Sequence, residues 1–448
     1  LHAAIVDPRL RAVASSCGVS TPQDALAGRH LWDHCDCMYS HNCFGVDIAA
    51  YAALIAPRPA LFVCSEHDLL FSPDEFRAFA ERTRRIYRLL GCEERCVYRQ
   101  FPGPHGERPE ALAAIDGWFD AHLAGESRPP AGPFLPEQDE AALTVFNGAP
   151  PQPNRLDLLP ELLSPLGSVP LPRTAAEWPA IRDAAVERLR RDVFDRIAGG
   201  DARLGLERVA DSQSRGGEAG PILARRYRAR PGGVEVWLNT MRPPDARPFV
   251  VLGVAGPDED AFDLPARVGG HTAGGVIQAG FEPRGTGMTA AAPARRLALL
   301  RAGALTGLTP AMLMVRDLRR LLVERDTVEE WRQAPLILYG RGDAAVVCLY
   351  AALLEPQAVA GVVLESLPAS HRAGTAPILG ILRVLDLDQA LGLVAPRPAA
   401  LVDGPHGLRT WSARAYRRVG AAKRLIRTES LSRALDRVMD EWQRENAT

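Results

Sequence analysis

The sequence predicts an α/β protein built on mostly parallel sheets with helices on both faces. Short, continuous apolar runs such as residues 60–64 and 249–253 are typical of strands buried on both faces. These runs alternate with segments long enough for helices, such as residues 73–90 and 177–198, and residues 233–238 are a further candidate strand. A proline-rich segment, residues 124–173, divides the chain. We therefore expect a first domain over residues 1–123, a linker over 124–173 and a second domain over 174–448.

Composition and charge give no indication of a nucleic-acid-binding or membrane protein. Of the 448 residues, 47% are hydrophobic and 24% charged, the balance of a soluble globular protein. The formal net charge is −1, so electrostatics favours neither a nucleic acid nor an anionic membrane as partner. No apolar run approaches the roughly 18 residues of a membrane-spanning helix. The sequence leaves localisation and oligomeric state open.

The first domain carries a carboxylate and a histidine at the ends of two neighbouring strands. Asp68 follows the apolar run 60–64, a helix is expected over 73–90, and a second strand, 95–101, leads to His105. Because parallel strands end at one edge of the sheet, we expect Asp68 and His105 to lie within hydrogen-bonding distance. Alternatively, Asp68 caps a turn and His105 is a solvated loop residue. Glu66 is the nearest rival for the acid.

Five short motifs follow one another across residues 1–123: Asp7-Pro8-Arg9, Ser16-Cys17-Gly18, the Ala-Leu-Ile-Ala-Pro-Arg-Pro run at 53–59, the Asp68 loop and Pro104-His105. In this order they resemble the C-terminal half of an α/β-hydrolase of the acetyl xylan esterase and dienelactone hydrolase type. The resemblance implies a serine hydrolase that cleaves a carboxylic ester, in acetylated carbohydrate or another small molecule. It makes Asp68 the triad acid and His105 the general base.

The chain also repeats itself. Residues 349–356 match residues 1–8 at an offset of 348, and residues 393–399 match 54–60 at an offset of 339. We therefore expect a partial first copy and a complete second copy of one fold. In the second copy Gly342 occupies the serine position of the Gly-x-Ser-x-Gly turn. The acid position falls on Gly407 or, with a small shift, on Asp403, and no histidine follows His406. The second copy is predicted to be catalytically inactive.

The same offset of 348 places the nucleophile of the first copy before Leu1. We therefore expect the 448 residues to contain the acid and the base but not the serine, and to show no esterase activity alone. The main alternative is a non-catalytic binding or scaffolding protein. A lesser one is dinucleotide binding, because Gly340-x-Gly342-x-x-Ala345 follows a strand and Glu365 ends the next. Against this, Asp343 would place a carboxylate beside the pyrophosphate.

A loop over residues 30–47 is rich in possible metal ligands, namely His34, Cys35, Cys37, His41 and Cys43. Thiolate and imidazole together suit zinc, but the Cys-x-Cys spacing lacks the usual Cys-x-x-Cys knuckle. A packed lid over the active site is the alternative that we favour. The sequence thus predicts no metal and no cofactor, and the cysteine spacing imposes no disulfide framework.

Overall fold

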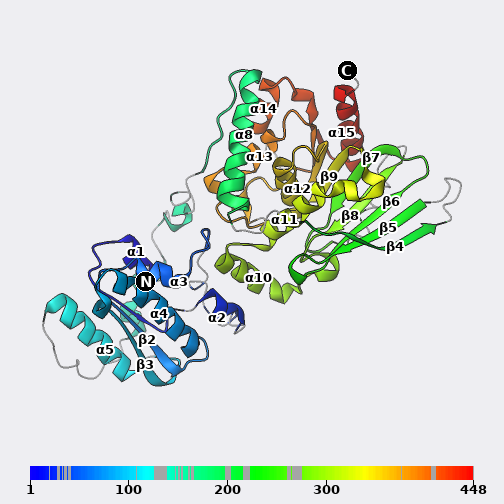
Figure 1. The fold of residues 1–448 in the computed structure, drawn as a ribbon. Helices are drawn as coiled ribbons and strands as arrows, with labels where there is room; N and C mark the ends of the chain where they lie inside the picture. The colour runs from blue at the N-terminus through cyan, green and yellow to red at the C-terminus, as the bar shows by residue number, and fades with distance from the viewer. Residues whose placement is uncertain are drawn as a thin grey trace. The chain divides into compact units, whose positions relative to one another are not determined.

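The computed structural model describes the chain except for residues 20, 28–30, 33, 35–37, 39–41, 107, 126–138, 147, 150–151, 153–154, 160–161, 163–165, 197–202, 215–221, 260–263, 265–274, 375, 405–409 and 447–448. It forms two compact units (Figure 1). Unit 1 comprises Leu1–Leu159 with Arg301–Gly307, and unit 2 comprises Pro160–Leu300 with Leu308–Thr448.

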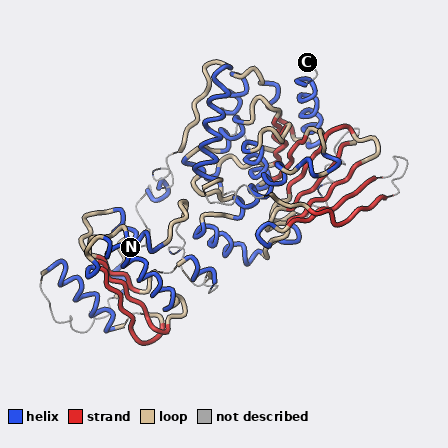
Figure 2. The backbone as a smooth tube through the Cα atoms, in the orientation of Figure 1, coloured by secondary structure: helices blue, strands red, loops and turns tan. Residues whose placement is uncertain are grey.

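Unit 1 is built on a parallel sheet whose three described strands have the order β1-β2-β3. These are β1 (Val13–Ser16), β2 (Ala60–His67) and β3 (Cys96–Pro104). The described helices are α1 (His2–Val6), α2 (Pro22–Ala27), α3 (Ile48–Ala53), α4 (Pro73–Leu89), α5 (Pro109–Phe119) and α6 (Glu140–Leu143). The strands lie between α4 and α5 in Figure 2. Because both faces are covered, β2 is apolar and buried from Ala60 to Cys64.

Unit 2 contains a larger, mixed sheet with the order β12-β11-β10-β9-β7-β8-β6-β5-β4 among the described strands. Its strands are β4 (Glu207–Ser214), β5 (Ile222–Ala229), β6 (Val236–Arg242), β7 (Arg247–Val254), β8 (Val276–Glu282), β9 (Leu336–Arg341), β10 (Gly361–Glu365), β11 (Ala399–Val402) and β12 (Leu425–Thr428). From β7 to β12 the pairings are parallel, whereas β6 runs antiparallel to both β5 and β8. From β5 onward, only the exchange of β7 and β8 departs from sequence order. This is the sheet of an α/β-hydrolase.

Helices complete the layers of unit 2. They are α8 (Trp178–Leu189), α11 (Pro310–Val323), α12 (Asp343–Leu354), α13 (Leu387–Leu393), α14 (Trp411–Arg418) and α15 (Leu431–Asn446), with α10 (Pro293–Thr306) divided between the units. Helix α12 is buried from Ala344 to Leu354, and α15 packs its apolar side against β10, β11 and β12. No single described helix meets the length and hydropathy of a membrane span; α10 and α11 meet them jointly but are bent by 78°.

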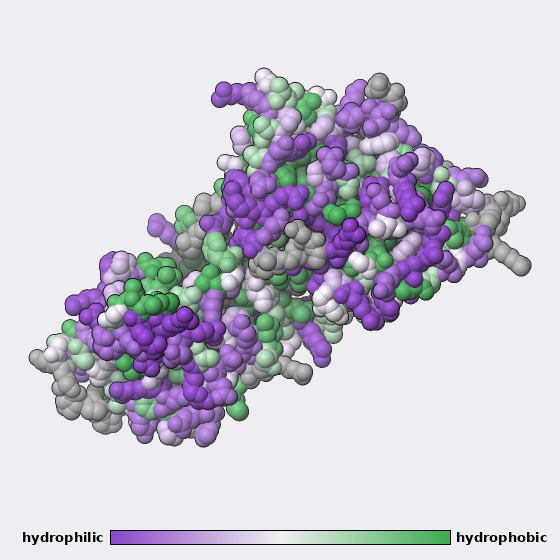
Figure 3. Space-filling view, in the orientation of Figure 1, coloured by the Kyte–Doolittle hydropathy of each residue, from purple (hydrophilic) through white to green (hydrophobic). Residues whose placement is uncertain are grey.

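Several boundaries differ from the sequence-based expectation. The helix expected over 177–198 is α8, which ends at Leu189 and continues as a π-helical turn, Arg190–Phe194. The strand expected over 233–238 starts only at Val236, because Gly233 lies in a turn with φ +82°. Strands β4 and β5 were not expected at all, since their many charged residues hide the apolar pattern. The face in Figure 3 is mostly hydrophilic, in keeping with the 24% charged composition.

Candidate active site

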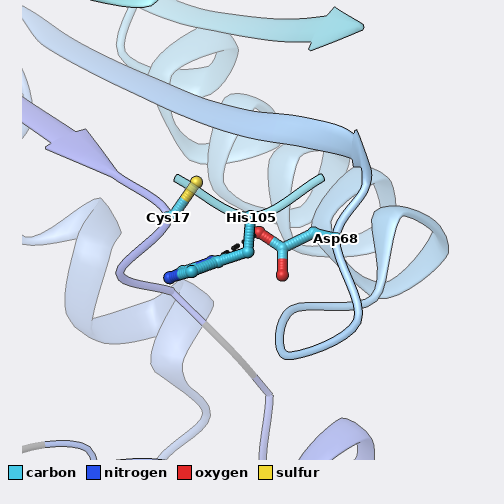
Figure 4. Close-up of side chains that lie close together, drawn as sticks. All are labelled: Cys17, Asp68 and His105. Atoms are coloured by element: carbon cyan, nitrogen blue, oxygen red, sulfur yellow. Dashed lines mark hydrogen bonds and ion pairs between the residues drawn. The ribbon is translucent and has the colours of Figure 1, made fainter. Parts of the chain in front are cut away.

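Asp68 and His105 meet at the carboxyl edge of the unit 1 sheet. His105 Nδ1 lies 2.9 Å from Asp68 Oδ2 (Figure 4). An ionised carboxylate can only accept, so this bond fixes the tautomer in which Nδ1 carries the proton and Nε2 has a free lone pair. Asp68 follows β2 and His105 follows β3, and these strands pair in parallel from Ala60 with Cys96 onward. The sheet register thus brings together two residues 37 positions apart.

The loop after β2 holds the carboxylate in place. Asp68 Oδ1 accepts hydrogen bonds from the backbone N–H groups of Leu70 at 2.9 Å and Phe71 at 3.0 Å. The other oxygen binds His105, and the side chain of Asp68 is 0% exposed. A buried carboxylate is costly unless its oxygens are hydrogen-bonded. Here both oxygens have partners, so Asp68 is fixed in one orientation.

His105 is held by its ring as well as by its hydrogen bond. The imidazole stacks on Phe71, with ring centroids 5.6 Å apart and an interplanar angle of 18°. The side chain is nevertheless 41% exposed. A buried acid, an oriented imidazole and an open approach to that imidazole are the arrangement that a general base requires. Glu66, the rival acid, is exposed and is not the partner of His105.

A third side chain, which the sequence reasoning used only as part of a motif, lies beside this pair. Cys17 directly follows β1, and its backbone has a φ of +41°. Its Sγ, an oxygen of Asp68 and a ring nitrogen of His105 all lie within 4.8 Å of one another (Figure 4). The sequence does indicate that Cys17 stands at the end of a strand. Only the strand order, which motif spacing does not give, shows that this strand lies next to β2 and brings Cys17 beside Asp68 and His105.

The thiol of Cys17 is also electrostatically distinct. A hydrogen bond with the Cys64 thiol lowers the pKa of Cys17 to about 6, against the opposing effects of burial and the Asp68 charge. Its Sγ also lies 3.9 Å from the Ser65 hydroxyl oxygen. The pKa of Cys64 is raised by the same hydrogen bond and by burial. Cys17 is therefore the thiol of this pair that ionises first.

The histidine- and cysteine-rich loop is only partly described. His34 is buried; its Nε2 lies 2.8 Å from the Leu70 carbonyl oxygen, and its ring packs on Phe71 at 4.7 Å. It therefore supports the loop that carries Asp68. Cys43 is half-buried and forms no disulfide with a described residue, whereas Cys35, Cys37 and His41 lie outside the described residues. The choice between zinc ligands and a packed lid therefore stays a prediction.

In unit 2, Gly342 lies at a sharp turn between β9 and α12. Its φ of 56° and ψ of −120° are unfavourable for any other residue type. A Cβ at Gly342 would meet nothing within 4 Å, whereas one at Gly340 would lie 2.5 Å from the Ala344 carbonyl oxygen. The turn thus has the close packing of a nucleophile elbow. Gly342, which the sequence predicts at the nucleophile position, faces open space and carries no side chain.

The predicted acid and base positions of unit 2 are only partly described by the structure. Asp403 follows β11 with a φ of +48°, whereas Gly407 and His406 lie outside the described residues. Strand β12 ends at Thr428 and α15 begins at Leu431, so two residues connect them, whereas four residues, 105–108, connect β3 and α5 in unit 1. The sequence after Thr428 contains no histidine.

The glycine turn also bears on dinucleotide binding. Glu365 is hydrogen-bonded by the Tyr339 hydroxyl and lies 3.5 Å from Arg341, rather than standing free for a ribose. Asp343 Oδ1 accepts from the Ala376 N–H at 2.9 Å and places a carboxylate in the first turn of α12, where a pyrophosphate would bind. Both contacts favour a structural role for these residues. A cavity of about 590 Å³ lies beside the turn, with Arg284, Arg341 and Asp343 among its lining residues.

Comparisons with known proteins find similar folds only at low identity. No family model and no curated protein matches the chain. Among solved structures, a putative acetyl xylan esterase from Bacteroides fragilis has a TM-score of 0.47 and 11% identity, over 63% of this chain and 84% of that chain. A glucuronoyl esterase from Solibacter usitatus has a TM-score of 0.43 and 11% identity, over 62% and 98%. Acetyl xylan esterase 1 from Thermoanaerobacterium sp. JW/SL YS485 has a TM-score of 0.37 and 14% identity, over 65% and 99%.

At these values the likeness decides neither the fold nor the function, and the strand order carries the fold assignment. The chain is an α/β protein whose larger unit has the sheet of an α/β-hydrolase.

Proposed function

We propose that unit 1 provides the acid and the base of a carboxylic ester hydrolase. The observation that supports this most directly is the 2.9 Å contact between His105 Nδ1 and the buried Asp68 carboxylate, with the imidazole partly open to solvent. In this proposal His105 Nε2 takes the proton of a serine hydroxyl as it attacks the ester carbonyl. The imidazolium then returns the proton to the leaving alcohol, while Asp68 stabilises its charge.

We place the nucleophile on a strand that would pair with β1 along the edge where no described strand lies. Unit 2 supports this, because β9 pairs with β10 there and carries the Gly342 turn. The offset of 348 between residues 1–8 and 349–356 then puts the serine on residues preceding Leu1. The motif order of residues 1–123 resembles acetyl xylan esterases, so we propose acetylated carbohydrate or another small ester as substrate.

The test is hydrolysis of 4-nitrophenyl acetate by the 448-residue chain and by the same chain extended at its N-terminus. We expect turnover only from the extended protein. His105→Ala should then lower kcat/KM by about 10³-fold or more, because the serine loses its base. The matched control is His67→Ala, a neighbouring exposed histidine, which should leave the rate unchanged.

Two results would contradict this assignment. One is an extended protein whose rate is indifferent to His105→Ala. The other is turnover by the 448 residues that disappears with His105→Ala, since this would place the nucleophile within the chain.

A second candidate function is non-catalytic binding by unit 2. The observation that favours it is the cavity of about 590 Å³ beside the Gly342 turn, where the nucleophile side chain is missing. Isothermal titration with acetylated xylo-oligosaccharides would test it. Binding that is weakened by Arg341→Ala supports a ligand-binding unit 2, and absence of binding argues for a purely structural one.

A further inference from the structure

Three different metal-ligand atoms converge beside the acid–base pair of unit 1. The Cys17 sulfur, a His105 ring nitrogen and an Asp68 carboxylate oxygen lie within 4.8 Å of one another. Each comes from the end of a different strand, β1, β2 or β3, and these strands are adjacent in the sheet. Figure 4 shows the three side chains close together, with the His105 ring bonded to the Asp68 carboxylate. The donors are thus supplied by a rigid framework and not by one flexible loop.

The donor types fit a particular class of ion. Thiolate, imidazole and carboxylate are the three ligand types of zinc, with distances of about 2.0 to 2.3 Å to the metal. In a tetrahedral site, neighbouring ligand atoms are therefore roughly 3.4 to 3.6 Å apart. The three ligand atoms lie within 4.8 Å of one another. Side-chain rotations that move these atoms by roughly an ångström bring them to the tetrahedral spacing. Magnesium and calcium prefer oxygen ligands and do not suit a sulfur donor.

We propose that Cys17, Asp68 and His105 bind a thiophilic divalent cation such as zinc, with a fourth coordination position left open at the exposed edge of the sheet. One thiolate and one carboxylate balance the two positive charges of the ion. The second oxygen of Asp68 keeps its hydrogen bonds from Leu70 and Phe71, which orient the ligand from outside the coordination sphere.

Metals bind cysteine through its thiolate, and a cysteine occupies this strand end in unit 1 only. Unit 2 provides an internal contrast, because the residue at the matching strand end is Ser366, which shares the positive φ, 50° against 41°. Ser366 N–H donates to Val402 as Cys17 N–H does to Val63. The thiol is therefore not a requirement of the backbone turn.

Metal binding and general-base catalysis would use the same groups. In the metal-bound form the 2.9 Å bond between His105 and Asp68 is replaced by bonds to the ion, so the imidazole is no longer oriented for proton transfer. The ion would therefore act as a reversible inhibitor. This consequence alone rests on the proposed hydrolase function, whereas metal binding does not.

The experiment is titration of the full chain with cobalt(II), which replaces zinc and reports thiolate ligation by a charge-transfer absorption band. A Cys35→Ser, Cys37→Ser, Cys43→Ser background removes the thiols of the 30–47 loop. In this background we expect one cobalt per chain, a thiolate band, and displacement of cobalt by zinc. Adding Cys17→Ser should abolish the band, and His105→Gln should weaken binding at least tenfold.

Far-UV circular dichroism of each variant establishes that it is folded. Cys92→Ser is the matched control, because Cys92 is a buried thiol of unit 1 that lies outside the proposed ligand set and bonds the Tyr87 carbonyl instead. Retention of the band in Cys17→Ser, or its loss in folded Cys92→Ser alone, would overturn the proposal. So would a band that requires the loop thiols. Since this readout needs no turnover, its failure is distinct from a failure of the hydrolase assignment.

Discussion

The last three strands of the two units share one scaffold but end in different loops. In unit 1, Val13 pairs with Ala60 and Ala60 with Cys96; in unit 2, Val362 pairs with Ala399 and Ala399 with Leu425. Arg58 donates from its guanidinium to the carbonyls of Ala4, Asp7 and Leu10. Arg397 donates in the same way to the carbonyls of Ala352, Pro356 and Val359.

Tyrosine side chains extend the likeness. Tyr87 donates its hydroxyl to the Arg58 carbonyl at 2.9 Å, and Tyr416 donates to the Arg397 carbonyl at 2.8 Å. Beyond the strand ends the two units differ. Among the described residues, a histidine side chain bonded to a carboxylate lies at the strand ends of unit 1, where His105 binds Asp68, and not at those of unit 2. The comparison teaches that packing and backbone hydrogen bonding maintain the scaffold, whereas chemistry depends on a few side chains in the loops.

The largest expected effect separates the two acid positions. Asp68→Asn should lower the esterase rate of the extended protein by about 10³- to 10⁴-fold, because an amide does not hold the productive imidazole tautomer. Asp403→Asn at the end of β11 should leave the rate unchanged. Steady-state kinetics on a short-chain aryl ester measures both. Comparable losses from the two substitutions would refute the division into a working site and an inactive one.

The arginines test whether the scaffolds are equivalent. Arg58→Ala and Arg397→Ala should each lower the free energy of unfolding by about 3 kcal/mol or more, because three backbone carbonyls lose a charged donor. Burial lowers the pKa of Arg397 to about 10, which leaves it charged at neutral pH. Denaturant unfolding followed by tryptophan fluorescence and circular dichroism measures both. A negligible effect at one arginine would show that its hydrogen bonds to the three carbonyls stabilise only the other unit.

The third prediction concerns acid sensitivity, which we assign to unit 2. His371, on the short helix η11 (His371–Ala373), has its Nε2 2.8 Å from the Tyr350 hydroxyl oxygen. Burial lowers the pKa of His371 to about 4. The unfolded chain takes up the proton at a higher pH, near 6.5, so stability is full above that value and falls as pH drops towards 4. The loss at low pH is at most roughly 3 kcal/mol.

Thermal unfolding between pH 4 and 7 checks this sign. His371→Gln should flatten the dependence assigned to this histidine, because glutamine does not titrate. The exposed His67→Gln is the control. A variant His371→Gln with the unaltered pH profile would show that other groups cause the acid sensitivity.

The smallest effect on stability is expected at the Gly342 turn between β9 and α12. Gly342→Ala should destabilise unit 2 by about 1 to 2 kcal/mol, since φ +56° is unfavourable for a residue with a Cβ although space for it is open. Esterase activity of the extended protein should not change. Chemical denaturation measures the first outcome and aryl ester hydrolysis the second. Stabilisation by the substitution would contradict the strained conformation of this turn.

The sequence by itself determined the features that depend on local pattern. Apolar runs predicted the buried strands, and the linear order of Asp68, a helix and His105 predicted that both groups lie at one sheet edge. Their meeting at 2.9 Å follows because parallel neighbours share an edge. Strands β4 and β5 were not predicted, because their charged residues interrupt the apolar pattern, and the carboxylate that Arg225 of β5 binds, Glu330, lies far away in the sequence.

Only the tertiary structure decided what joins Asp68 and His105. Cys17 is 51 residues from one and 88 from the other, and it reaches them because β1 pairs with β2 and not with β3. Its ionisation likewise depends on Cys64, a neighbour across that pairing. Motif spacing specifies which residues end strands. Strand order specifies which ends are adjacent, and it is set by burial of the whole sheet, which no short stretch of sequence encodes.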